Sequence, residues 1–261
     1  MQINKPLFLA TALAAALMCL PAMADTVDPL SVSGGAVGTS APSGFGSTSL
    51  AGNSSTKGEY YVSVASLLGA PVQLKDVASI SYWTNKPGDA GSPDWTVLLY
   101  TALQNSGNSA SWYHSRLNAE PYFVNSATDT ANAWHEWSTG GAEPLKFFDQ
   151  PRSNTFGTYT DPTLAELVAG PVTWDGSGQS GVTVNYGDEY LNLISLQTGS
   201  TWANGFTGMV DGLTITLVSG ASVTVDFEAA AANDVPEPAS LALVGVALAG
   251  LGLARRRNNK A

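Results

Sequence analysis

The stretch that decides the fold is GLTITLVSGASVTVDFE, at residues 212–228. Apolar and hydroxyl side chains alternate on both sides of Ser219-Gly220-Ala221, which is typical of two strands joined by a tight turn. Leu213, Ile215 and Leu217 fall on one face of the first strand, because successive side chains of a strand point to opposite faces. The stretch therefore predicts an antiparallel hairpin that buries one face against a second layer.

Similar alternating or β-branched runs recur along the chain and predict further strands at residues 59–64, 77–83, 95–100, 182–186 and 190–196. Shorter aromatic runs lie at residues 111–117, 120–124, 134–137 and 145–148. Many short strands of this kind predict an all-β protein, an antiparallel β-sandwich of two packed sheets.

One short helix is predicted at residues 161–168. Asp161 can cap its free amide groups, Pro162 suits its first position, and Gly170 with Pro171 ends it. About two turns of helix do not change the fold class, so we expect this helix to close one end of the sandwich.

The first 24 residues read as a secretory signal peptide. Lys5 supplies the positive charge, an apolar run follows at residues 7–20, and Ala22-Met23-Ala24 is a cleavage site that leaves Asp25 as the first mature residue. The only cysteine, Cys19, lies in the removed segment, so the mature chain is predicted to contain no disulfide.

The C-terminal segment has three consecutive parts. Val235-Pro236-Glu237-Pro238 is followed by an uncharged apolar run at residues 239–254 and then by Arg255-Arg256-Arg257. The run has 16 residues, just under the roughly 17 that set the lower limit for crossing a bilayer, so it predicts a short transmembrane helix of marginal stability in the membrane. The arginines resist translocation, so residues 258–261 are expected in the cytoplasm.

This order of parts resembles the PEP-CTERM sorting signal of Gram-negative bacteria. The resemblance implies recognition by an exosortase, a membrane protease-transpeptidase, which processes the chain near Pro236-Glu237-Pro238. It also implies export across the inner membrane, transient membrane anchoring, and a final place at the cell surface or outside the cell. Residues 202–228 look like the closing segment of concanavalin-like or jelly-roll sandwiches.

Between the two targeting ends, we expect a Gly/Ser-rich lead-in with one strand at residues 25–57, a sandwich domain at 58–228 and a linker at 229–234. Residues 25–234 contain six basic and twenty acidic residues, a net charge of −14. Such an acidic surface argues against binding of nucleic acid or anionic lipid.

No recognisable catalytic motif is present. His135-Glu136 begins like a zinc-protease motif, but position 139 is Thr, and the sequence around Ser180 is not a nucleophile elbow. Glu120, Glu136 and Glu143 could supply the two carboxylates of a glycosidase. A secreted glycan hydrolase is therefore the alternative to a non-enzymatic protein.

Calcium is the cofactor that the sequence allows, because carboxylates in turns suit this ion. The acids in such contexts are Asp89, Asp94, Asp175, Asp188, Glu189 and Asp211. Asp is also a common turn residue without any metal, so the sequence favours no cofactor.

Trp134 and Trp137 flank a His-Glu pair, which is an unusual choice for deep burial. We expect these two rings to form an exposed patch that contacts glycan. The resulting hypothesis is an exosortase-sorted surface or matrix protein associated with extracellular polysaccharide. An ice-binding protein is a further alternative, although Thr214, Thr216 and Thr224 are few for a regular threonine array.

Overall fold

The computed structural model of the chain describes residues 24–88, 92–104, 113–124, 129–153, 157–174, 181–199 and 205–230. These residues form fourteen strands, two short α-helices and four 3-10 helices. The prediction of an all-β protein is therefore confirmed. The chain divides into two units, residues 1–229 and residues 230–261, and the fold described below is that of the first.

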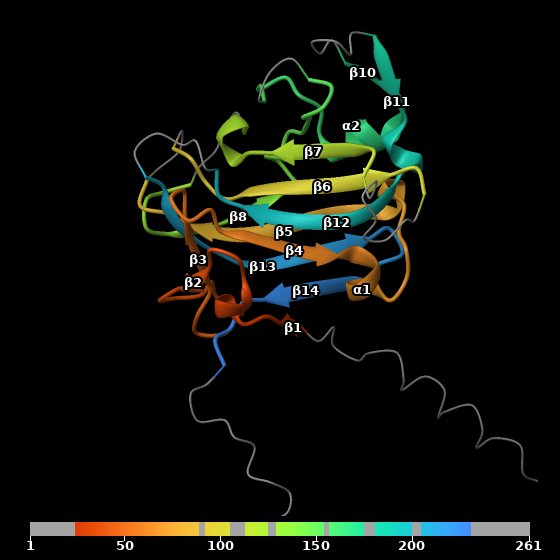
Figure 1. Ribbon diagram of the computed structural model, residues 1–261. Coiled ribbons are helices and arrows are strands. Elements are labelled where there is room, and N and C mark those ends of the chain that lie inside the picture. Colours follow the sequence, from red (N-terminus) through yellow and green to blue (C-terminus); the bar gives the residue numbers. More distant parts are fainter. Residues whose placement is uncertain are drawn as a thin grey trace, which may run out of the picture. The chain divides into compact units, whose positions relative to one another are not determined.

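The predicted hairpin at residues 212–228 lies within a seven-stranded sheet (Figure 1). Leu213 stands opposite Val225 and Ile215 opposite Val223, as the alternation predicts. The longest strand of this sheet, β13, pairs with β5 along one side and with β3 and then β14 along the other. The sheet contains β1 (Asp25–Thr26), β2 (Ala36–Val37), β3 (Leu50–Asn53), β5 (Val77–Asn85), β8 (Trp134–Ser138), β13 (Thr207–Leu217) and β14 (Ser222–Asp226).

A second, five-stranded sheet has the order β4-β12-β6-β7-β9 and is antiparallel throughout. In Figure 1 its strands β7, β6, β12 and β4 follow one another from top to bottom. Strand β6 is buried along its whole length, which explains its nearly continuous apolar sequence. The strands are β4 (Glu59–Ser63), β6 (Thr96–Ala102), β7 (Ser115–Ala119), β9 (Phe148–Asp149) and β12 (Tyr190–Gln197).

The two sheets share one hydrophobic core. Tyr60 of β4 meets Phe227, which follows β14, edge to face with 4.8 Å between ring centroids. Trp95, the residue before β6, packs on Gly52 of β3, where a Cβ atom would lie 2.5 Å from the indole ring. Tyr82 of β5 donates a 2.9 Å hydrogen bond to the Trp95 carbonyl. Aromatic side chains therefore fill the space between the layers.

The predicted helix is present as α2 (Leu164–Ala169), but its cap differs from the prediction. Thr163 caps it and forms a capping box with Glu166, whereas Asp161 accepts hydrogen bonds from Thr158. A second helix, α1 (Val64–Leu68), was not predicted. The remaining elements are the hairpin of β10 (Val172–Trp174) and β11 (Val182–Val184), and the 3-10 helices η1 (Pro29–Ser31), η2 (Leu74–Asp76), η3 (Pro121–Phe123) and η4 (Tyr186–Asp188).

Residues 25–57 are more ordered than the predicted lead-in with one strand. They contribute β1, β2 and β3 to the seven-stranded sheet, and Leu50 is fully buried in the core. Within the aromatic run at residues 120–124, residues 121–123 form a 3-10 helix, because Pro121 suits the first position of a helical turn. In the described ranges no helix combines the length and apolarity that crossing a bilayer requires. The helix predicted at 239–254 lies outside the described residues.

Candidate functional site

The outer face of the five-stranded sheet carries a row of paired side chains. Tyr61 of β4 stands opposite Ser195 of β12, Ser195 opposite Leu98 of β6, and Leu98 opposite Asn118 of β7. Directly paired residues point to the same face of a sheet. Because the flanking residues of these strands belong to the core, the row itself faces away from the core.

The neighbouring row brings Leu193, Tyr100 and Arg116 together. The Tyr100 ring lies 5.5 Å from Tyr113, edge to face, and 6.2 Å from Tyr61. Tyr61 and Tyr113 are 45% and 37% exposed, whereas Tyr100 is buried. Two accessible rings therefore flank a buried one on this surface.

Gln197 of β12 orients the Tyr61 hydroxyl. Its Nε2 atom donates to Tyr61 Oη and Ser195 Oγ, both at 2.8 Å, and lies 3.3 Å from Tyr100 Oη. Burial raises the pKa of Tyr61 well above its usual value, and the neighbouring Tyr100 raises it further. The phenol therefore stays neutral and keeps its hydroxyl as a hydrogen-bonding group.

Two polar atoms at the far end of these rows have no partner among the described residues. They are Arg116 Nε and Asn118 Oδ1, both buried. Asn118 Nδ2 donates to Gln150 Oε1 at 3.0 Å, which fixes the direction of the Asn118 amide. A buried donor and a buried acceptor left unpaired are costly, so this end of the face needs water or a ligand.

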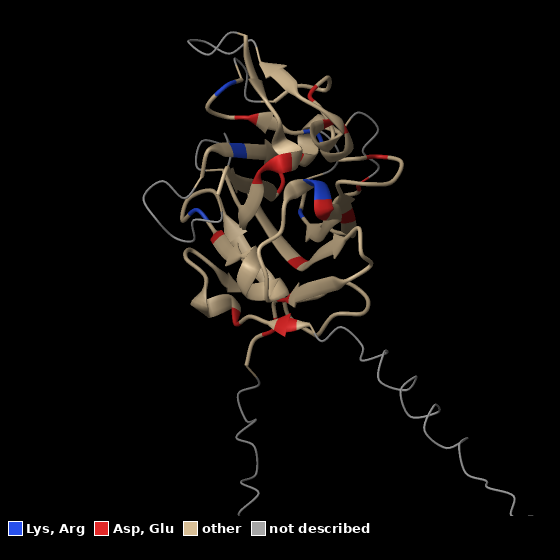
Figure 2. Ribbon diagram, turned by 90° about the vertical axis from the view of Figure 1, so that its right-hand side faces the viewer, with Lys and Arg blue, Asp and Glu red and all other residues tan. Residues whose placement is uncertain are grey.

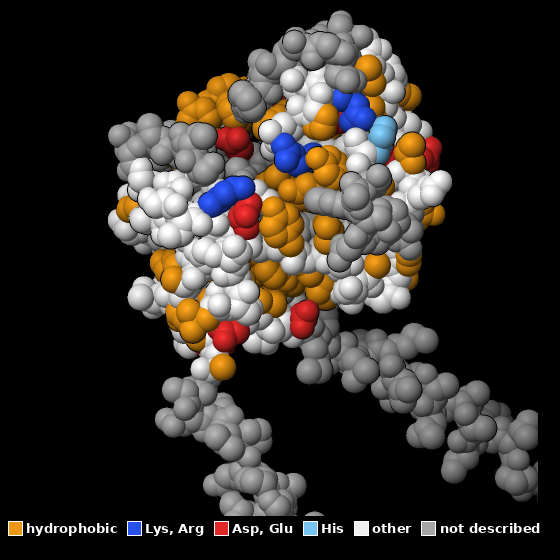
Figure 3. All heavy atoms as spheres, in the orientation of Figure 1, with side chains coloured by type: hydrophobic (Ala, Val, Ile, Leu, Met, Phe, Trp, Pro, Cys, Tyr) orange, Lys and Arg blue, Asp and Glu red, His pale blue; other side chains and the backbone are white. Residues whose placement is uncertain are grey.

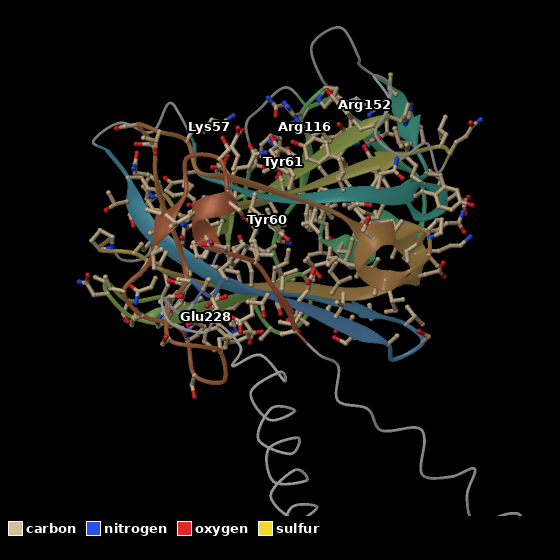
Figure 4. The ribbon with its side chains drawn as sticks, turned by 60° about the horizontal axis from the view of Figure 1, so that its bottom comes forward. Lys57, Tyr60, Tyr61, Arg116, Arg152 and Glu228 are labelled. Carbon is tan, nitrogen blue, oxygen red and sulfur yellow. The ribbon has the colours of Figure 1, made fainter. Side chains whose placement is uncertain are left out.

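We call this surface the tyrosine face. It comprises Tyr61, Leu98, Tyr100, Tyr113, Arg116, Asn118, Leu193, Ser195 and Gln197. Figure 3 shows hydrophobic side chains gathered at the centre of this side of the molecule, with basic side chains beside them. Figure 4 places Lys57, Tyr61, Arg116 and Arg152 along the same side. The face therefore combines aromatic, amide and cationic groups.

A partly buried polar network lies beside Tyr113. His114 Nε2 is 3.1 Å from Arg152 Nη2, which can only donate, so Nε2 accepts and the proton sits on Nδ1. Nδ1 then donates to Glu189 Oε1 at 2.8 Å. Ser115 Oγ lies 3.3 Å from this same Nδ1 atom. A catalytic triad needs serine and acid on opposite imidazole nitrogens, so this arrangement is not one.

The predicted aromatic patch of Trp134 and Trp137 does not form. Trp137 is 2% exposed, and its indole nitrogen donates to Thr84 Oγ1 at 2.8 Å and to Asp94 Oδ2 at 3.1 Å. The expectation that Trp137 contacts glycan is therefore wrong. Trp134 is partly buried and pairs with Asn85 on the outer face of the other sheet.

A hollow of about 400 Å³ lies next to Asn85 on the seven-stranded sheet. Its lining is small or neutral: Gly34, Ala36, Ala51, Gly52, Asn53, Asn85, Pro87, Asn132, Thr207, Gly208 and Met209. Among the described residues no titratable side chain lines it, so these lining residues offer no group for acid-base chemistry.

A buried ion cluster joins three charged side chains at the end of β5. Lys86 Nζ lies 3.0 Å from Asp129 Oδ2 and 3.6 Å from Asp94 Oδ2. Burial raises the pKa of Asp94 to about 6, although Lys86 and hydrogen bonds from Thr84, Trp95 and Trp137 oppose the shift. Here an ammonium group occupies the space between two carboxylates.

Most acids considered as calcium ligands have protein partners. Asp94 and Glu189 belong to the two networks above, Asp188 pairs with Lys75, and Asp211 accepts from the amides of Gly212 and Phe227. Asp89 and Asp175 lie outside the described residues. Within the described ranges, no group of three or more metal-binding side chains comes together. The expectation that the protein needs no cofactor, with calcium as the ion that the sequence allows, stays untested.

The described residues include part of the predicted signal-cleavage site and none of the sorting motif. Ala24 is described, and Asp25 begins β1, where it pairs with Val225, whereas Ala22 lies outside the described residues. The residues of the sorting motif, 235–238 and 255–257, also lie outside them. The comparison with protein families therefore carries the evidence for the C-terminal segment.

Residues 234–257 match the family model of the PEP-CTERM protein-sorting motif. The chain carries a PEP-CTERM sorting signal. It is exported across the inner membrane, anchored transiently by its C-terminal tail, and sorted to the cell surface, with an exosortase as its processing partner. Comparison with curated proteins and with solved structures gave no match. The match at 234–257 covers the sorting signal only and says nothing about the ligand of the folded domain before it.

Proposed function

We propose that this exosortase-sorted protein is a non-enzymatic component of the cell surface or extracellular matrix that binds polysaccharide through its tyrosine face. The observation that carries the proposal is the combination of the 45% exposed Tyr61 ring with the unpartnered Arg116 and Asn118 atoms on one sheet surface. Apolar ring faces pack against sugar rings, and amide and guanidinium groups match sugar hydroxyls.

The charges around the face favour binding over hydrolysis. A glycosidase places two carboxyl groups on either side of the scissile bond. Glu59, which pairs in register with Gln197, forms an ion pair with Lys57 at 2.5 Å. Mixed polar and aromatic side chains can hold a polymer without cleaving it.

We also propose that the two sheets form a jelly-roll or concanavalin-like β-sandwich. The shared core and the mainly antiparallel pairing support this assignment. Sandwiches of this kind serve many functions, so the assignment adds nothing to the choice of ligand.

Retention on polysaccharides tests the proposal. The mature protein should be retarded in gels that contain its polymer, without release of reducing sugar. Tyr61→Ala should weaken retention about fivefold to tenfold, since a stacked aromatic ring contributes roughly 1 kcal/mol beyond its buried area. Tyr159→Ala is the matched control, because Tyr159 is 44% exposed but lies outside the tyrosine face. Equal effects of the two substitutions would contradict a role for this face.

The rival proposal is a glycan hydrolase, and one observation favours it. Burial raises the pKa of Glu120 to about 7, which is the range of a general acid at neutral pH. Glu136 is exposed on β8, in the other sheet. Release of sugar by the mature protein, abolished by Glu120→Gln and preserved in Glu136→Gln, would replace the binding proposal with this one.

A further inference from the structure

We propose that the polymer bound by the tyrosine face is acidic, with carboxylate groups that pair with Arg116. This inference rests on the function proposed above and names the class of ligand. It starts from the basic residues, of which the region 25–234 contains only six against twenty acids. On the ribbon in Figure 2, the Lys and Arg positions are few and scattered among the Asp and Glu positions.

Several of these cations are already neutralised by a carboxylate. Lys57 pairs with Glu59, Lys75 with Asp188, Lys86 with Asp94 and Asp129, and Arg152 with Asp149. Arg116 differs from them. Among the described residues, no carboxylate lies within salt-bridge distance of its guanidinium, and its Nε atom is buried without a hydrogen-bond partner.

A carboxylate satisfies such a group well. The planar guanidinium binds a carboxylate through two parallel hydrogen bonds, and these charge-assisted bonds are about twice as strong as neutral ones. A hydroxyl group would leave the positive charge uncompensated. The acceptor Asn118 Oδ1, two residues along β7, would in turn receive a neighbouring sugar hydroxyl. One acidic sugar can therefore offer a carboxylate to Arg116 Nε and a hydroxyl to Asn118 Oδ1.

The distance between the two ends of the tyrosine face requires a polysaccharide and not a single sugar. Tyr61 and Asn118 stand in one row but on β4 and β7, with β12 and β6 between them. Three strand spacings separate them by about 14 Å. A polymer can place one ring on Tyr61 and a carboxylate at Arg116 at the same time, whereas a free monosaccharide reaches only one of them.

The overall charge of −14 does not prevent this contact. At physiological salt, exposed charges farther away than about 8 Å are largely screened. Glu59, the acid in register with the face, is neutralised by Lys57. The charges close to Arg116, and not the net charge of the domain, therefore decide which polymer binds.

The test compares polygalacturonate with the same polymer after chemical reduction of its carboxyl groups, using the mature protein in affinity gels and calorimetry. Native polymer should bind about tenfold more tightly than reduced polymer. Arg116→Met should remove this difference, because it should weaken binding to native polymer more than binding to reduced polymer. Lys75→Met, which also removes one cation, is the matched control and should keep the difference.

Each outcome separates the two proposals. Equal binding of both polymers, or preference for the reduced one, would overturn the acidic ligand and leave polysaccharide binding in place. Failure to bind either polymer, or any neutral glycan, would overturn both proposals. If Arg116→Met weakened binding to both polymers by the same factor, with an unchanged melting temperature, this would also contradict carboxylate recognition.

Discussion

Replacing Lys86 by Met should destabilise the protein strongly, because the lysine compensates two buried acids. Lys86, Asp94 and Asp129 are 5%, 2% and 7% exposed. The ammonium lies 3.0 Å from Asp129 and 3.6 Å from Asp94, and it donates to the Ser92 carbonyl at 3.0 Å. Methionine has nearly the same volume, so the substitution removes the charge with little change in packing.

The expected loss follows from what the substitution leaves behind. Breaking a buried ion pair by removing one partner costs about 3–5 kcal/mol, since an uncompensated charge remains. With a urea m-value of about 2.5 kcal/mol/M, a loss of about 4 kcal/mol lowers the unfolding midpoint by about 1.6 M. Such a loss is a large share of the 5–15 kcal/mol that roughly bounds the stability of natural domains.

Urea unfolding followed by tryptophan fluorescence measures this loss. Lys75→Met is the control, because Lys75 and Asp188 form an exposed pair 3.0 Å apart, and it should leave the urea midpoint almost unchanged. In Lys86→Met, lowering the pH from 8 to 5 should restore part of the stability by protonating Asp94, whose pKa burial already raises to about 6. A loss below about 1 kcal/mol without pH dependence would refute a dry, mutually compensated cluster.

Three further predictions concern other parts of the chain. Burial raises the pKa of Asp211 to about 7, so the folded state binds this proton more tightly than the unfolded state does. The free energy of unfolding should therefore rise by about 2 kcal/mol from pH 8 to pH 5. In urea titrations, Asp211→Asn should flatten this pH dependence. Gly212→Ala should lower the free energy of unfolding by more than about 1 kcal/mol, because φ is +62° and the added Cβ would lie 2.4 Å from the Phe45 ring. Gly140→Ala is the control and should change the melting temperature little, because the nearest atom to its added Cβ is 3.9 Å away. Replacing Pro236-Glu237-Pro238 by three alanines should keep the full-length chain in the inner membrane, and an extracellular protein with an intact C-terminus, detected by mass spectrometry, would contradict processing at this motif.

The strands of the fold were predictable where one face alternates. In β14, Val223 and Val225 lie on the face that the two-residue period assigns to them, and in β5 the same period explains the buried Ile80 and Tyr82. The strand β3 was not predictable in this way. Its glycine, Gly52, is required by the Trp95 ring that packs on it from a distant segment, and no local pattern reports that contact.

The error about the tryptophans has a different origin. Trp134 and Trp137 lie three residues apart in one strand, and in a strand an odd separation sends side chains to opposite faces. The two rings could therefore never form one patch once the segment was a strand. The flanking polar residues are compatible with this alternation, because Glu136 is exposed while Trp137 is buried.

The tyrosine face lay beyond sequence reasoning because it depends on strand order. Tyr61, Leu98 and Asn118 come from β4, β6 and β7, and β12 from much later in the chain lies between β4 and β6. Only this order and the register put the three side chains in one row. No pattern within any one strand distinguishes Arg116 or Asn118 from an ordinary polar residue on an exposed sheet surface.

The end of the folded domain explains how sorting can leave the proposed binding face unchanged. Glu228 (Figure 4) accepts hydrogen bonds from the amides of Ser47 and Thr48 at 2.7 and 2.9 Å and from the Ser47 hydroxyl at 2.8 Å. Ala229 then donates to Thr48 Oγ1 at 2.7 Å. These contacts attach the last strand to the loop before β3, and they lie several residues before Pro236. Cleavage at the sorting motif therefore removes none of them, and the domain reaches the cell surface with its tyrosine face as it was before processing.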